Sequence, residues 1–118
     1  MKVVSIQAAG VPIVECVDAI ASVDDALGLI SACIERDSQR LLIDARCLPE
    51  AFFDLRSRFA GELIQKFENY RLRLAVVFAP DTKRSERFEQ FLAEARRGRG
   101  FRAFTAREDA EAWLSAPS

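Results

Sequence analysis

The stretch AGELIQKFENYRLRLAVV, residues 60–77, changes from a helical pattern to a strand pattern with almost no loop between them. Leu63 and Phe67 recur at the four-residue spacing of one helix face. Leu72–Phe78 is a nearly continuous apolar run, which is typical of a parallel strand covered on both faces. A helix that leads directly into such a strand predicts an α/β fold.

The rest of the chain continues this alternation. Two short apolar runs separated by a turn containing Gly10 predict a β-hairpin at the N-terminus. Strands are expected at residues 2–7, 12–17, 40–45, 72–78 and 101–105, and helices at 22–36, 49–67, 85–97 and 105–114. The order β-β-α-β-α-β-α-β-α predicts a single domain, residues 1–118, with a mainly parallel five-stranded sheet.

Several helix ends have their own signals. Ser22, Ser85 and Thr105 precede helical patterns and are expected to act as N-caps. Asn69 and Gly98 follow helical patterns and are expected to adopt the left-handed conformation that ends a helix.

The composition excludes several kinds of active site. The chain has no histidine, which removes Ser-His-Asp and Cys-His catalytic groups and nearly all zinc sites. Its 17 Lys and Arg against 18 Asp and Glu give a net charge of -1, so no overall field favours nucleic acid or an anionic membrane. Three cysteines without CxxC spacing suggest reduced thiols and a cytoplasmic protein. No cofactor, metal or membrane segment is predicted.

A row of alternating charges runs along the predicted helix 49–67. Asp54, Arg58, Glu62 and Lys66 are four residues apart, so each pair would contribute only ~0.2–0.5 kcal/mol. A solvated outer face is the preferred interpretation. The pair Ala60-Gly61 keeps a partner surface open as an alternative, because glycine inside a helix costs about 1 kcal/mol relative to alanine and suggests that another backbone approaches closely.

The turn after this helix, Asn69-Tyr70-Arg71, combines polar and aromatic side chains. One interpretation is that this turn only ends the helix, with Tyr70 packed under the next strand. A ligand or partner surface is the alternative, and it would include Gly61, Glu62, Lys66, Asn69, Tyr70 and Arg71.

Ligands of open α/β sheets usually bind at the carboxyl ends of the strands. That edge is expected to carry Asp44, Arg46, Cys47 and Lys83, with Thr82 beside the last of these. Arg46 and a helix N-terminus would lower the pKa of Cys47 if that thiol were reactive. A small apolar filler is the commoner role for such a cysteine. Asp44 and Glu50 would form an acid/base pair only if both faced one cavity.

An arginine cluster surrounds the sequence GRGFRA, residues 98–103, which matches a dinucleotide-binding fingerprint by letters alone. The match follows a helix and opens a strand, which is the reverse of what phosphate binding at a helix N-terminus needs. The cluster comprises Arg96, Arg97, Arg99, Arg102 and Arg107. Without a recognition motif, nucleic acid is disfavoured as a partner.

Nine phenylalanines are many for a chain of this length, and most come from the second and third predicted helices. The structural interpretation is that these side chains form the core by packing against the sheet. An apolar pocket or a homodimer face is the sharper alternative.

The motifs FFDL (52–55), AGELIQKF (60–67) and NYRLRLAVV (69–77) resemble a bacterial family of unknown function, DUF4180, whose members have no assigned activity. The element order also resembles the STAS domain of anti-sigma-factor antagonists and sulfate transporters. Antagonists of that type are switched by phosphorylation of a serine or threonine at the start of the second helix. The loop at 44–50 has neither residue, so the switch is not carried over.

The hypotheses for function therefore stay general. The preferred one is a non-enzymatic regulatory or binding module that acts through protein contact or a small ligand, with a homodimer as one form. The alternatives are a carrier of an apolar ligand in a Phe-lined cavity and a small enzyme that uses Asp44 and Cys47.

Overall fold

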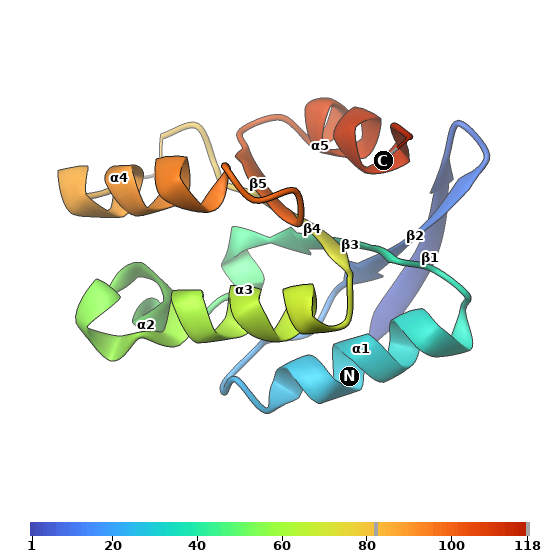
Figure 1. The fold of residues 1–118 in the computed structure, drawn as a ribbon, viewed down its shortest axis with the longest axis horizontal. Coiled ribbons are helices and arrows are strands. Elements are labelled where there is room, and N and C mark those ends of the chain that lie inside the picture. Colours follow the sequence, from blue (N-terminus) through green and yellow to red (C-terminus); the bar gives the residue numbers. More distant parts are fainter. Residues whose placement is uncertain (82, 118) are drawn as a thin grey trace.

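The five strands form one sheet in which the spatial order follows the chain order, β1-β2-β3-β4-β5 (Figure 1). The computed structural model describes residues 1–81 and 83–117. The first two strands, β1 (Val3–Ala8) and β2 (Val11–Cys16), are antiparallel. The remaining three run parallel to β2 and to one another: β3 (Arg40–Asp44), β4 (Arg73–Val77) and β5 (Phe101–Phe104). The predicted hairpin and mainly parallel sheet are confirmed.

The hairpin turn consists of two residues in the left-handed region, Ala9 with φ 51° and Gly10 with φ 78°. Two positive φ values in succession characterise a type I′ turn, whose twist matches that of the flanking strands. The turn fixes the register, in which Ala8 lies opposite Val11 and Ile6 opposite Ile13.

Helices cover both faces of the sheet. The elements are α1 (Asp25–Glu35), α2 (Glu50–Phe53), α3 (Phe59–Asn69), α4 (Glu86–Ala95) and α5 (Arg107–Ser115), with single 3₁₀ turns η1 (Ala45–Cys47) and η2 (Leu55–Ser57). One face packs on α1 to α4 and the other on α5, as the two core clusters show. In Figure 1, α1 and α3 lie on one side of the strands and α5 on the opposite side. No helix among the described residues is both long enough and apolar enough to cross a membrane.

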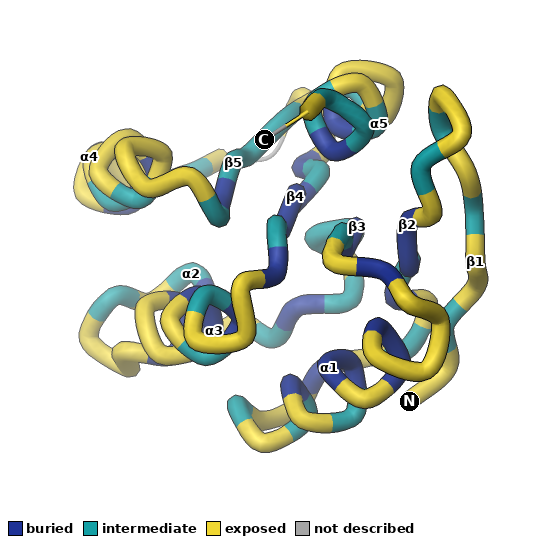
Figure 2. The backbone as a smooth tube through the Cα atoms, turned by 45° about the vertical axis from the view of Figure 1, so that its right-hand side comes forward, coloured by how far each residue is buried: buried dark blue, intermediate teal, exposed yellow. Residues whose placement is uncertain are grey.

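The alternation of side chains along the strands divides the core between these faces. Leu41 and Ile43 of β3 point into the larger cluster, whereas Leu42 between them packs on α5. Figure 2 shows buried residues on the inner sides of α1 and α3 and along the central strands. Parallel strands covered on both faces explain the continuous apolar run that the sequence shows at β4.

Phenylalanine rings fill the space between α2, α4 and the end of β4. Phe88 lies at the centre, with ring centroids 5.8 Å from Phe52, 5.4 Å from Phe53, 6.3 Å from Phe78 and 5.9 Å from Phe91. Two of these pairs, those with Phe52 and Phe78, have the edge-to-face geometry that aromatic rings prefer. The rings therefore contact one another and form core.

The predicted single helix over residues 49–67 is wrong, because the chain breaks twice within it. Asp54 has extended backbone angles and Arg58 has φ 63°, so α2, η2 and α3 are separate elements. The Asp54 carboxylate accepts a hydrogen bond from the Arg56 N–H (3.1 Å), and the Ser57 hydroxyl accepts one from the Phe59 N–H (3.1 Å). Such local bonds from Asp and Ser side chains compete with helix formation. The four-residue charge row consequently does not exist.

Within the described residues, no other backbone of this chain approaches Gly61 closely. Gly61 lies in the first turn of α3, and a Cβ added there would meet nothing within 4 Å. A close approach from within the chain therefore does not explain this glycine, and the approach of a second subunit stays a prediction.

The predicted cap at Ser85 is confirmed, since its hydroxyl accepts from the Phe88 N–H (3.1 Å). The other two predicted caps are wrong. The first residue of α1 is Asp25, whose carboxylate accepts from the Ala21 and Ser22 N–H groups, and α5 follows Ala106 without a side-chain cap.

The predicted left-handed residues are wrong as well. Arg71, with φ 59°, takes the left-handed position after α3, while Asn69 is the last helical residue. Gly98 has no positive φ, because α4 ends one turn earlier at Ala95.

Candidate functional site

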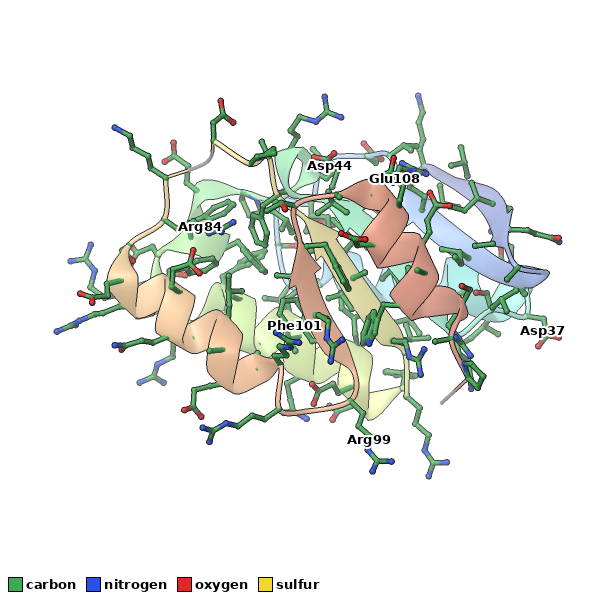
Figure 3. The ribbon with its side chains drawn as sticks, turned by 90° about the horizontal axis from the view of Figure 1, so that it is seen from above. Asp37, Asp44, Arg84, Arg99, Phe101 and Glu108 are labelled. Carbon is green, nitrogen blue, oxygen red and sulfur yellow. The ribbon has the colours of Figure 1, made fainter. Side chains whose placement is uncertain are left out.

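A hollow of about 630 Å³ lies at the amino ends of β4 and β5. Six arginines line it together with a single carboxylate, Glu68, and we call it the arginine pocket. The arginines are Arg71, Arg73, Arg96, Arg97, Arg99 and Arg102. Figure 3 shows Arg99 at the end of the strands opposite to Asp44. The pocket therefore lies at the edge of the sheet where the sequence does not predict a ligand.

The sheet order brings two arginine-rich segments together at this edge. Arg71 and Arg73 come from the turn into β4, and Arg102 comes from β5. Because β4 and β5 are neighbours, the connection from α4 that carries Arg96, Arg97 and Arg99 runs beside the turn after α3. Segments about thirty residues apart in the chain thus form one surface.

The inner wall of the pocket is built around Trp113. The Arg73 guanidinium carbon lies 5.1 Å from the centroid of this indole and that of Arg102 lies 5.5 Å away, both within the range of cation–π contacts. Arg73 also donates from Nη1 to the carbonyls of Trp113 and Ala116, both at 2.8 Å.

The C-terminal end of α5 supplies the acceptors for these cations. Arg40, which lies beside Arg73 in the sheet, donates to the carbonyls of Leu114 and Ala116. Free carbonyls and the negative end of the helix dipole both favour cations at this position. Burial lowers the pKa of Arg73, and the neighbouring charges of Arg40 and Arg102 lower it further. The Arg40 and Arg73 guanidinium groups are therefore held by carbonyl oxygens, and Arg102 lies near them over the same indole as Arg73.

Positive charge in the arginine pocket is largely unpaired. Within residues 1–81 and 83–117, the one ion pair that involves a pocket arginine joins Arg97 to Glu94 at 3.9 Å. The Nε atom of Arg102 is buried and has no hydrogen-bond partner in the same part of the chain. A buried donor without a partner is rare in folded proteins. The pocket thus offers donors that the described residues do not satisfy.

Glu68 lies against the glycines of the loop before β5. A Cβ added at Gly100 would come within 3.0 Å of the Glu68 Cγ, and one at Gly98 within 3.5 Å of its Oε1. The Gly100 carbonyl also accepts from the Leu74 N–H at 2.7 Å. The absence of a side chain at Gly100 therefore gives Glu68 its place in the wall of the pocket.

The opposite, carboxyl edge carries the residues that the sequence predicts as a site. The Asp44 carboxylate accepts from the Arg46 backbone N–H at 2.9 Å and from its Nε at 3.1 Å. Partial burial raises the pKa of Asp44, but the hydrogen bonds from Arg46 and the charges of Arg46 and Arg107 outweigh it, so the pKa is lowered. Asp44 therefore caps the turn η1, and Arg46 pairs with it.

The Cys47 thiol is not activated. Burial raises its pKa and the charge of Asp44 raises it further, against smaller opposing contributions from Cys16 and Arg46. Its sulfur lies 3.7 Å from the Cys16 carbonyl, to which it donates. The expectation that Arg46 and a helix N-terminus would lower this pKa is wrong, because burial dominates. Lys83 is exposed on the loop after β4, and Thr82 lies outside the described residues.

Arg107 belongs to this carboxyl edge and does not join the other arginines. It donates to both oxygens of Glu15, at 2.7 and 2.6 Å, and to Glu111 at 2.8 Å. The hydrogen bonds to Glu15 raise the pKa of Arg107. The hollow between Arg107, Glu15 and Asp44 measures only about 30 Å³, so nothing larger than a water molecule fits between these three side chains.

The remaining predicted residues are spread over α3 and the turn after it. Gly61 and Glu62 border an apolar hollow of about 350 Å³ together with Phe91. Lys66 is half-buried, and Asn69 accepts a hydrogen bond from Gln65 at 2.9 Å. Tyr70 is 50% exposed, so the expectation that it packs under β4 is wrong.

Of the ten residues predicted for a site, Arg71 alone lines the arginine pocket. The sequence places Arg96, Arg97, Arg99 and Arg102 in one cluster, but sequence reasoning assigned no ligand to it. It missed Arg73 and Trp113. The signal that could have found them is the position of arginines just before or early in two successive strands, because neighbouring parallel strands start at the same edge.

A family model described as a domain of unknown function, DUF4180, matches residues 8–114. No curated protein and no solved structure matches the chain. Among the described residues, no cluster of His, Cys, Asp and Glu side chains could hold a metal ion. The matched range runs from the end of β1 to the last turn of α5 and includes every residue that lines the arginine pocket except Pro117. This match confirms the resemblance seen in the sequence, and the chain belongs to the DUF4180 family.

Proposed function

We propose that this protein is a non-enzymatic binding module that holds a small polyanion, of the phosphate type, in the arginine pocket. The observation that carries the proposal is the gathering of six arginines around one open hollow with a single carboxylate among them. Arginine presents a planar set of donors that matches the oxygens of phosphate and carboxylate. Two or more anionic groups would use the positive charge more fully than one.

The chemistry of the lining supports binding rather than catalysis. Arginine stays protonated in proteins, so it cannot exchange a proton with a substrate. The chain contains no histidine, and Glu68 is the one carboxylate in the pocket. Leu72, Trp113 and Pro117 add apolar contacts that would suit an organic portion of the ligand.

The alternatives have less support. An enzyme based on Asp44 and Cys47 would need a free carboxylate and an activated thiol, whereas Asp44 is bonded to Arg46 and the pKa of Cys47 is raised. A carrier would need a hollow lined by phenylalanines, whereas Phe52, Phe78 and Phe88 are almost completely buried against other rings.

A second candidate function, contact with a protein partner, is favoured by the apolar hollow beside α3. Leu55, Ala60 and Phe91 line it, with Arg58 and Glu62 at its margin. Nucleic acid stays disfavoured, since the net charge is -1.

A regulatory role and a STAS-like fold remain part of this proposal. The order of strands and helices supports the STAS-like assignment. A phosphorylation switch is not included, because the loop at 44–50 has no serine or threonine and lies at the edge opposite to the arginine pocket. A cytoplasmic location is supported by the cysteines, all three of which are free thiols.

Trp113 provides the test, since it is the only tryptophan in the chain and lines the pocket. Its fluorescence is recorded while pyrophosphate is added at constant ionic strength. We expect a saturable change that weakens as salt is raised, because exposed charges are screened. The charge-reversal variant Arg99→Glu should shift the midpoint to higher concentration. A titration without saturation at millimolar pyrophosphate would refute the proposal.

A further inference from the structure

The outer edge of β1 is an unpaired strand edge with an unusual composition. The strand reads VVSIQA and contains no charged residue, proline or glycine. Natural proteins usually protect an exposed edge with charges, proline, bulges or a very short strand. The other edge of this sheet, β5, has four residues and carries Arg102. The edge of β1 is therefore the one without protection.

The hairpin register shows which backbone groups face outward. Ala8 and Val11 flank the two-residue turn, so they form a hydrogen-bonded pair. Such pairs recur at every second residue, so Ile6 and Val4 are also hydrogen-bonded to the residues opposite them in β2. Gln7 lies opposite Pro12, which has no N–H to share. Val3, Ser5 and Gln7 consequently direct their N–H and C=O groups away from β2.

This arrangement is complementary to a second copy of itself. We propose that two copies of the chain pair antiparallel through their β1 edges, with Ser5 facing Ser5 of the second copy on the two-fold axis. Val3 of each copy would then pair with Gln7 of the other, which gives about six backbone hydrogen bonds. A continuous ten-stranded sheet would result.

The side chains fit the same register. On the face that carries α5, Val4 of one copy would lie opposite Ile6 of the other. Val4 is 43% exposed in the single chain, while Ile6 already packs on the cluster under α5. Apolar cross-strand pairs of this kind stabilise antiparallel strands. On the other face, Arg36 donates to the Ser5 hydroxyl at 3.2 Å, and its charge is offset by Glu35 at 3.7 Å.

The inference does not depend on the anion-binding proposal, because β1 contributes no residue to the arginine pocket. Cysteine cross-linking tests it in a Cys47→Ser background, since the other two cysteines are buried. In Ser5→Cys, the two Cα atoms would be ~5.5 Å apart across the axis, which is within disulfide range. In Gln7→Cys, the matched control, the two positions would be offset by four residues, or about 13 Å.

We expect mild oxidation to convert Ser5→Cys to a covalent dimer on the order of tenfold faster than Gln7→Cys, since the control pair exceeds the reach of a disulfide. Analytical ultracentrifugation of the unmodified chain should show a concentration-dependent dimer. The variant Ser5→Pro, which removes the outward N–H and also the hydroxyl that accepts from Arg36, should be monomeric with an unchanged circular dichroism spectrum. A chain that stays monomeric at all concentrations, equal cross-linking at both positions, or a dimer that survives Ser5→Pro would overturn the proposal.

Discussion

The arginines at the carboxyl edge of the sheet and those at the amino edge have different partners. At the carboxyl edge, Arg46 pairs with Asp44, Arg84 with Glu89, and Arg107 with Glu15 and Glu111. At the amino edge, Arg40 and Arg73 rest on carbonyl oxygens of α5, and the other arginines surround an open hollow. Arginines with a carboxylate or carbonyl partner hold parts of the fold together, whereas those around the hollow that have neither are left for a ligand. At the edge where ligands of α/β sheets usually bind, Arg46, Arg84 and Arg107 already have carboxylate partners.

The largest effect is expected from reversing charge at the amino edge. The double variant Arg71→Glu with Arg99→Glu should weaken pyrophosphate binding by at least ~100-fold, because each arginine supplies charged hydrogen bonds worth ~1.5–3 kcal/mol. Both residues are exposed, so the fold should be unaffected. The matched control, Arg46→Glu with Lys83→Glu, changes net charge equally at the carboxyl edge. Pyrophosphate affinity is measured by Trp113 fluorescence. If both double variants lose affinity equally, only the overall charge of the protein matters.

The next effect concerns stability at the carboxyl edge. Arg107→Gln leaves Glu15, whose side chain is only 14% exposed, without its cation. Since Arg107 itself is half-exposed, we expect a loss of about 1–2 kcal/mol in the free energy of unfolding. Urea denaturation measures this loss, with Arg87→Gln on the exposed side of α4 as the control. Pyrophosphate binding should not change in Arg107→Gln, and a change would show that the two edges are coupled.

A smaller effect is expected in cysteine chemistry. Because its pKa is raised, the Cys47 thiol holds less thiolate at neutral pH than an unfolded cysteine does. Alkylation by iodoacetamide, followed by mass spectrometry, should therefore be several-fold slower in the native protein than in urea, and should speed up as the pH rises. Cys16 and Cys33 should react more slowly still, since burial raises the pKa of each to about 11. Faster alkylation of native Cys47 would restore the enzyme hypothesis.

The smallest effect comes from Gly61. With open space around its Cα and an ordinary helical conformation, Gly61→Ala should stabilise the protein by about 0.5 kcal/mol. Gly10→Ala is the contrasting variant, because φ 78° in the hairpin turn strains any residue with a Cβ, and it should destabilise the protein by about 1 kcal/mol. Thermal unfolding distinguishes the two. A destabilised Gly61→Ala would indicate that another chain approaches α3 after all.

Patterns local in the sequence predicted most of the fold. The apolar run at Leu72–Phe78 and the turn at Gly10 were sufficient for β4 and the hairpin. The break between α2 and α3 was missed because the apolar periodicity continues through it. The Asp54 carboxylate accepts a hydrogen bond from a backbone N–H, and the Ser57 hydroxyl donates to two backbone carbonyls. Periodicity does not report these bonds, which outweigh that continuity.

The arginine pocket could not be predicted in the same way, because it depends on which strands are neighbours. Arg73 and Arg102 meet only because β4 and β5 are adjacent, and Trp113 joins them only because α5 crosses the opposite face of the sheet from the other helices. Chain order alone is compatible with other arrangements of strands and helices. The usual rule for ligand positions directed attention to the other edge.

The central claim, that the amino edge binds the ligand, is tested most directly by backbone amide chemical shifts in ¹⁵N-labelled protein during a pyrophosphate titration. We predict that the amide signals of residues 71–73 and 98–102, together with the Trp113 indole N–H signal, shift progressively and reach saturation. The amide signals of residues 44–47 should keep their chemical shifts. Shifts centred on residues 44–47 and Lys83, or no saturable shift at any position, would contradict the account.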